Sequence, residues 1–158
     1  MRFLMAVLLL SCVAHADDFS TESISIYWPV VESDEVGLAI RKTSKGTVVR
    51  LAHRFPCYVP CEVSLTPEQA VKVGRVLEKT DEAHRRLDGT GSKQEVQSIG
   101  KDISIRFQTD CSKTFRVVFL DEHGVERVSL NREDANDLAP YFEKMVERAK
   151  FLDSKVSL

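Results

Sequence analysis

The sequence predicts an α+β fold built from two tandem repeats, each a β-meander followed by a helix, whose strands form an antiparallel sheet with two helices packed on one face. Two observations carry this prediction: the second half of each copy repeats in sequence, and apolar residues alternate like strands ahead of each helix. The repeats run from about residue 23 to 87 and from about residue 94 to 152. The stretch DGTGSK, which starts at Asp88, is expected to join them as a short flexible linker.

The internal repeat is visible without gaps at an offset of 65 residues. The segment VSLTPEQAVKVGRVLEKTDEAHRRL, from Val63, aligns with VSLNREDANDLAPYFEKMVERAKFL, from Val128, and nine of the 25 positions are identical. Average composition gives only about one or two such matches. Because the strand end, the helix cap and the apolar stripe stay in register, we interpret the chain as a duplication.

Each copy ends in a helix with a clear start. Thr66 is the expected N-cap of the first helix, with Pro67 at its first position and Gln69 completing a capping box. Asn131 is the expected N-cap of the second helix. Pro140 lies inside that second helix, where it removes a backbone hydrogen bond, so a kink is expected there.

Strands are predicted where apolar residues alternate with polar ones, between turn signals. In the first copy the alternating residues are Ile24, Ile26, Trp28 and Val30, then Val36, Leu38 and Ile40, then Val49 and Leu51, then Cys61, Val63 and Leu65. In the second copy they are Val96, then Ile103, Ile105 and Phe107, then Phe115, Val117 and Phe119, then Val128 and Leu130. Each copy therefore has four predicted strands.

The N-terminus has the pattern of a secretory signal peptide. Arg2 precedes an apolar run of eight residues, and the sequence AHA at 14–16 has the form after which signal peptidase cuts. The run is shorter than the about 20 apolar residues that a membrane span needs. We therefore expect residues 1–16 to be removed and residues 17–158 to form one domain that is periplasmic or secreted.

A second cleavage pattern overlaps the first. The sequence LLSC, which ends at Cys12, resembles a lipobox, the site at which a lipoprotein is cut and lipidated on its cysteine. Leucine before the small residue is not the usual choice there, and the AHA pattern is the better match. A lipid anchor on Cys12 therefore stays as the alternative to a freely exported chain.

Two cysteines lie in the stretch RFPCYVPCE, where the second copy makes its corresponding turn with the shorter DEHG. Cys57 and Cys61 are expected to form a disulfide that ties this longer turn, with a contribution of about 2 kcal/mol for so short a loop. Cys111 is expected at an exposed hairpin tip. Whether it pairs with one of the other two cysteines or bridges two copies of the protein stays open at this point.

Redox catalysis and metal binding are the two alternatives to a disulfide for these cysteines. Redox catalysis is disfavoured, because the spacing is C-x3-C and a strand separates Cys61 from the helix that starts after Thr66. Metal binding has one supporting pattern: His53, Cys57 and Cys61 run H-x3-C-x3-C, and these ligands suit Cu(I) or Zn²⁺. This pattern defines the alternative function, a periplasmic metal-binding or thiol-handling protein.

The sequence contains no nucleophile elbow, zinc-protease helix or phosphate-binding loop. Nothing therefore argues for an enzyme, and no cofactor is expected. The net charge is −2 at pH 7, and no basic block is interleaved with aromatic residues, so nucleic acid is not an expected partner.

A compact exported domain of this kind is expected to act by binding another protein. The most concrete form is an inhibitor or immunity protein that blocks an enzyme acting in the cell envelope. The predicted binding residues are Pro56, Tyr58, Val59 and Pro60, with Tyr58 as the anchor because tyrosine is enriched at interface hot spots. A structural or assembly factor of the envelope is a further alternative.

Overall fold

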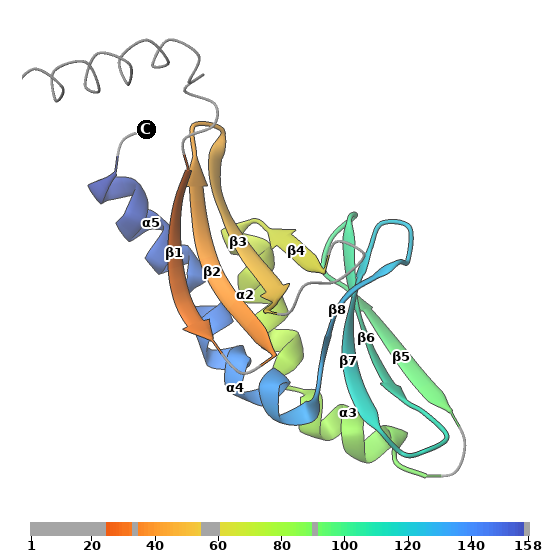
Figure 1. Cartoon of the computed structure of the whole chain (residues 1–158). Coiled ribbons are helices and arrows are strands. Elements are labelled where there is room, and N and C mark those ends of the chain that lie inside the picture. The colour runs from red at the N-terminus through yellow and green to blue at the C-terminus, as the bar shows by residue number, and fades with distance from the viewer. Residues whose placement is uncertain (1–24, 33–34, 55–60, 90–91, 157–158) are drawn as a thin grey trace, which may run out of the picture.

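The computed structural model describes residues 25–32, 35–54, 61–89 and 92–156 (Figure 1). The first repeat consists of β1 (Ser25–Glu32), β2 (Val36–Thr43), β3 (Gly46–His53), β4 (Glu62–Leu65), α2 (Pro67–Leu77) and α3 (Thr80–Leu87). The second repeat consists of β5 (Lys93–Ser98), β6 (Ile103–Thr109), β7 (Phe115–Asp121), β8 (Glu126–Leu130), α4 (Arg132–Glu143) and α5 (Met145–Lys155). The predicted α+β class and the tandem meander-plus-helix repeats are confirmed.

The strands form two sheets where one was expected. Each meander pairs antiparallel in chain order, giving the sheets β1-β2-β3-β4 and β5-β6-β7-β8. The last strands of the two sheets, β4 and β8, lie near each other at the centre of the molecule (Figure 1). The His53 side chain lies between the two sheets, where its Nε2 accepts a hydrogen bond from the backbone N–H of Ser129 in β8. Since that N–H is bonded to a side chain, it is not available to a neighbouring strand.

Both predicted helix starts are confirmed. The Thr66 hydroxyl accepts a hydrogen bond from the Gln69 backbone N–H at 3.2 Å, and the Gln69 side chain accepts one from the Thr66 N–H at 2.8 Å. The Asn131 side chain accepts a hydrogen bond from the Asp134 backbone N–H at 2.8 Å. These bonds satisfy N–H groups that have no partner inside a helix.

Each repeat has two helices where one was expected, because both helical segments are interrupted. The interruptions come at Lys79 (φ −90°, ψ 7°) and at Lys144 (φ −86°, ψ 5°), which are 65 positions apart. The helix α4 continues past Pro140 to Glu143, so the interruption does not lie at the proline, and the kink predicted at Pro140 stays a prediction. The first repeat has no proline at the matching position, so the interruption belongs to the repeat.

The interruption allows the repeats to exchange helices. The first helix of each repeat covers its own sheet, because α2 contacts β3 and β4, and α4 contacts β7 and β8. The second helix crosses over, because α3 contacts β5 and β6, and α5 contacts β2 and β3. Each sheet is therefore covered by helices from both repeats.

The buried apolar residues form a cluster that runs through both sheets and all four helices. Its largest fully buried members are Phe107, Phe119 and Phe142, each with no exposed surface. Helices α2 and α4 pack against each other at its centre. Within the described part of the chain, no helix has the length and apolar content needed to cross a bilayer.

Candidate binding site at the junction of the two repeats

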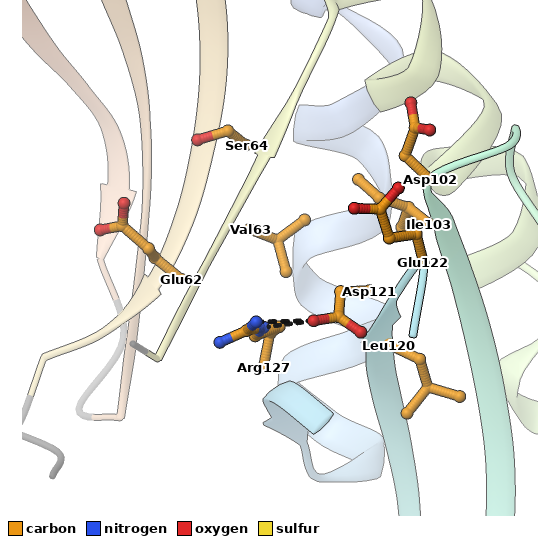
Figure 2. Close-up of a pocket in the computed structure, with 9 residues that line it drawn as sticks. All are labelled: Glu62, Val63, Ser64, Asp102, Ile103, Leu120, Asp121, Glu122 and Arg127. Carbon is orange, nitrogen blue, oxygen red and sulfur yellow. Dashed lines mark hydrogen bonds and ion pairs between the residues drawn. The ribbon is translucent and has the colours of Figure 1, made fainter. Parts of the chain in front are cut away.

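A pocket of about 260 Å³ lies where β4 of the first sheet meets the end of the second sheet (Figure 2). We call it the junction pocket. One wall is β4, with Glu62, Val63 and Ser64. The other wall comes from the second repeat, with Asp102, Ile103, Leu120, Asp121, Glu122 and Arg127.

Three of the nine residues that line the junction pocket are apolar. Val63, Ile103 and Leu120 are each at most 9% exposed. Figure 2 shows Val63 on the side of β4 that faces Ile103, whereas the Glu62 and Ser64 side chains point away. The alternation of side chains along a strand explains this arrangement. A ligand would therefore contact apolar groups with its body and meet polar groups at the rim.

Asp121 is held in place by its own turn. Its Oδ1 accepts hydrogen bonds from the backbone N–H groups of His123 and Val125 at 2.9 and 2.8 Å. Its Oδ2 accepts hydrogen bonds from Arg127 Nε and Nη2 at 2.9 and 2.6 Å. The bond from the Val125 N–H, followed by those from Arg127 and His123, lowers the pKa of Asp121 below its ordinary value. Asp121 and Arg127 thus compensate each other's charge.

Two carboxylates at the rim have no such compensation. Asp102 precedes β6 and Glu122 follows β7, and both are exposed. Among the residues that the structure describes, neither forms an ion pair with a lysine or arginine, and the Glu122 carboxylate lies 3.6 Å from His123 Nε2. Glu62 differs, because its carboxylate accepts a hydrogen bond from Arg50 Nε at 2.7 Å. The second-repeat wall of the pocket is therefore negatively charged.

The first repeat has a place that corresponds to this pocket. His53 at the end of β3 donates its backbone N–H to the Cys61 carbonyl at 3.0 Å, and Asp121 at the end of β7 donates its own to the Val125 carbonyl at 3.0 Å. His53 is paired with Val36 at the start of β2, as Asp121 is with Ile103 at the start of β6. His53 and Asp121 therefore occupy equivalent positions in the two repeats.

In the first repeat, the side chain of His53 occupies the space that corresponds to the junction pocket. Its Nε2 accepts a hydrogen bond from the backbone N–H of Ser129 in β8 at 3.3 Å. Its Nδ1 lies 3.4 Å from the Glu35 carbonyl oxygen, and because Nε2 accepts, Nδ1 carries the proton and faces that oxygen as the donor. In the second repeat Asp121 turns toward Arg127 instead, and the equivalent space stays open as the junction pocket.

The predicted binding residues Pro56, Tyr58, Val59 and Pro60 lie outside the described residues. The ends of their segment are placed, because the bond between His53 and Cys61 closes a connection of residues 54–60 between β3 and β4. The corresponding connection in the second repeat spans residues 122–124. The longer first-repeat turn is thus confirmed. The predicted binding residues therefore precede, along the chain, the strand β4 that forms one wall of the junction pocket.

Cys61 and Cys111 lie in the described part of the chain, whereas Cys57 does not. Cys57 lies outside the described residues, so its predicted disulfide with Cys61 stays a prediction. Cys111 is exposed, as expected, and it is free within this chain. Cys111 is therefore available as a free thiol or for a bridge between two copies of the protein.

The alternative metal site is incomplete in the described part of the chain. Both ring nitrogens of His53 face backbone groups, and no cluster of three or more His, Cys, Asp or Glu side chains suited to a metal occurs among residues 25–32, 35–54, 61–89 and 92–156. Because Cys57 lies outside these residues, the set of His53, Cys57 and Cys61 stays untested.

A second cavity, of about 410 Å³, lies between β1 and α4. Its lining includes Val31 and Glu32, which immediately precede residues 33–34, and those two residues lie outside the described part. We therefore base no site on it.

Reasoning from the sequence missed the junction pocket, because its two walls come from different repeats. The internal repeat is the one sequence signal that could have indicated a contact between the two copies. Aligning the sheets requires an offset of 68 at His53 and Asp121 but 65 at the helices, since the β3–β4 connection is longer. Compared with known protein families and with characterised proteins, the chain shows no match.

Proposed function

We propose that this chain is an exported protein-binding domain, most concretely an inhibitor or immunity protein that blocks an enzyme acting in the cell envelope. The junction pocket is proposed as part of its binding surface. The observation that supports this is an open pocket, lined by both apolar and charged residues, where the two interlocked repeats meet. Hollows of this kind take anchoring side chains in protein interfaces.

The chemistry of the pocket suits binding better than catalysis. General acids and bases work best with a pKa near the operating pH. Asp121 is tied to its turn and to Arg127, which moves its pKa away from neutrality. No histidine or cysteine is among the residues that line the pocket, and its one hydroxyl group, that of Ser64, points away (Figure 2).

The walls of the pocket are also well supported. Val63, Ile103 and Leu120 lie on strands that are hydrogen-bonded into the two sheets. A site on regular strands loses little conformational entropy when a partner binds, and so retains more of its interaction energy as affinity. The adjoining loop with Tyr58 would extend the contact beyond the pocket.

Site-specific photo-crosslinking in the native compartment tests this function. A photo-reactive residue replaces Lys101, which is exposed and adjacent to Asp102, and the matched control replaces Gln94 on the exposed strand β5. We expect one discrete crosslinked protein from position 101 and none from position 94. That protein, once identified, should lose its enzymatic activity on addition of this chain. Crosslinks that are absent, or identical at both positions, would contradict the proposal.

A further inference from the structure

We infer that the junction pocket recognises a basic side chain of the partner protein, with the imidazole of a histidine as the best fit, in the way that the equivalent place in the first repeat holds His53. This inference rests on the proposed function and names what the partner contributes. Three observations carry it: the filled counterpart, an available backbone donor, and the uncompensated charge of the rim.

The filled counterpart indicates the kind of group that fits. His53 and Asp121 hold equivalent positions, and the His53 ring occupies the space that is empty beside Asp121. The ring lies between β3 of one sheet and the backbone of Ser129 in the other. The junction pocket lies between the same elements with the repeats interchanged, so a ring placed there would meet the equivalent backbone groups.

The backbone donor follows from the register of β3 and β4. Hydrogen-bonded and non-hydrogen-bonded pairs alternate along an antiparallel ladder. His53 and Cys61 form a hydrogen-bonded pair, so Ser64, three residues later and opposite Arg50, falls in a non-hydrogen-bonded pair. Its N–H therefore points away from β3. Because β4 is the last strand of its sheet, this N–H faces the second repeat, as the N–H of Ser129 faces His53.

The negative charge of the rim selects a group that donates hydrogen bonds. Asp102 and Glu122 lie on the wall opposite Val63, and Asp121 is already compensated by Arg127 (Figure 2). A neutral imidazole can accept a hydrogen bond from the Ser64 N–H with one nitrogen and donate to a rim carboxylate with the other, and the charge of the carboxylate strengthens this second bond. Lysine and arginine satisfy the carboxylates but only donate, so they leave the Ser64 N–H without an acceptor.

Amide NMR titration of the full exported chain with single amino-acid probes tests this inference. The probes are the N-acetyl amides of histidine, lysine and arginine, with N-acetylalanine amide as the control that has no polar side chain. We expect saturable shifts of the Ser64, Ile103 and Arg127 signals with the histidine probe, and affinity at least about tenfold weaker for the alanine probe, which cannot form the charge-assisted hydrogen bond to the rim. Tighter binding of the lysine or arginine probe would support a basic ligand but overturn the preference for imidazole.

Two variants identify the pocket as the binding place. The double variant Asp102→Asn, Glu122→Gln is expected to weaken the histidine probe about tenfold or more, because it removes the rim charge and keeps the shape. The control Glu147→Gln changes an exposed carboxylate on α5, and binding should not change. The inference is overturned if no probe saturates, if the alanine probe binds equally well, or if the double variant binds like the parent. The crosslinking result at position 101 would then still decide the proposed function separately.

Discussion

Gly74 of α2 lies directly against Ala139 of α4, the residue that occupies the same position 65 residues later in the second repeat. A Cβ atom placed on Gly74 would lie 3.1 Å from the Ala139 carbonyl oxygen and 3.1 Å from the Glu143 backbone nitrogen. Equivalent residues of the two repeats thus meet where α2 packs on α4. This is what a pseudo-twofold axis through the helix pair requires.

A larger side chain at this crossing is expected to separate the helices. Gly74→Leu should destabilise the chain by about 1–3 kcal/mol, the usual cost of overpacking, although leucine has the higher helix propensity. Urea denaturation monitored by circular dichroism measures the change. The control Arg75→Leu places the same side chain at the neighbouring exposed position and should change stability by less than about 0.5 kcal/mol. A Gly74→Leu variant as stable as the parent would mean that the crossing is not tight.

The His53 contact to Ser129 predicts a variant that imidazole can rescue. His53→Ala leaves the Ser129 N–H without its partner between the two repeats, which should cost about 1–3 kcal/mol. Free imidazole should restore part of this loss, because it can occupy the vacated place. His123→Ala is the control, since the His123 side chain is 76% exposed in the β7–β8 turn. Thermal unfolding at increasing imidazole concentration gives the answer, and equal responses of the two variants would contradict it.

The lowered pKa of Asp121 predicts a pH-dependent contribution to stability. The N–H of Val125 and then Arg127 bond the carboxylate in the folded chain only, so the unfolded chain takes up the proton at higher pH. The stabilisation is complete above the ordinary pKa of aspartate and is lost as the pH falls through the lower folded value. Asp121→Asn should therefore be less stable than the parent at pH 7, and this difference should shrink toward pH 2. Denaturant melts at both pH values, with Glu122→Gln as the neighbouring control, measure it.

One intact-mass measurement tests both the predicted export and the predicted disulfide. Protein purified from the periplasm without reductant should begin at Asp17 and be two hydrogens lighter than the fully reduced chain, with Cys111 as its one alkylatable thiol. The longer β3–β4 connection motivates this expectation. Native mass spectrometry should find no metal. A bound copper or zinc ion together with three free thiols would instead favour the metal-handling alternative.

The predicted anchor of the binding loop is tested once a partner is identified. Tyr58→Ala should weaken binding by about 2 kcal/mol or more, as truncation of an interface hot spot does. Tyr27→Ala is the matched control, because Tyr27 is 49% exposed on β1, in the strand farthest from β4 within the first sheet. Isothermal titration calorimetry gives both values. An unchanged affinity for Tyr58→Ala would leave the loop out of the interface.

The sequence by itself determined the local elements. Alternation of apolar residues located the strands, and the capping residues Thr66 and Asn131 located the helix starts. Both signals depend on neighbours within a few positions along the chain, so they can be read without a fold. The repeat was visible for the same reason, because a duplicated segment carries the same local signals twice.

Only the tertiary structure decided how the two copies fit together. That α3 covers the second sheet and α5 the first depends on the interruptions at Lys79 and Lys144, which no proline or glycine marks. The junction pocket depends on contacts between residues far apart in the chain. His53 reaches Ser129, 76 positions away, while Asp121 bonds within its own turn. Packing between distant residues therefore determines which of two equivalent places is filled and which is left open for a ligand.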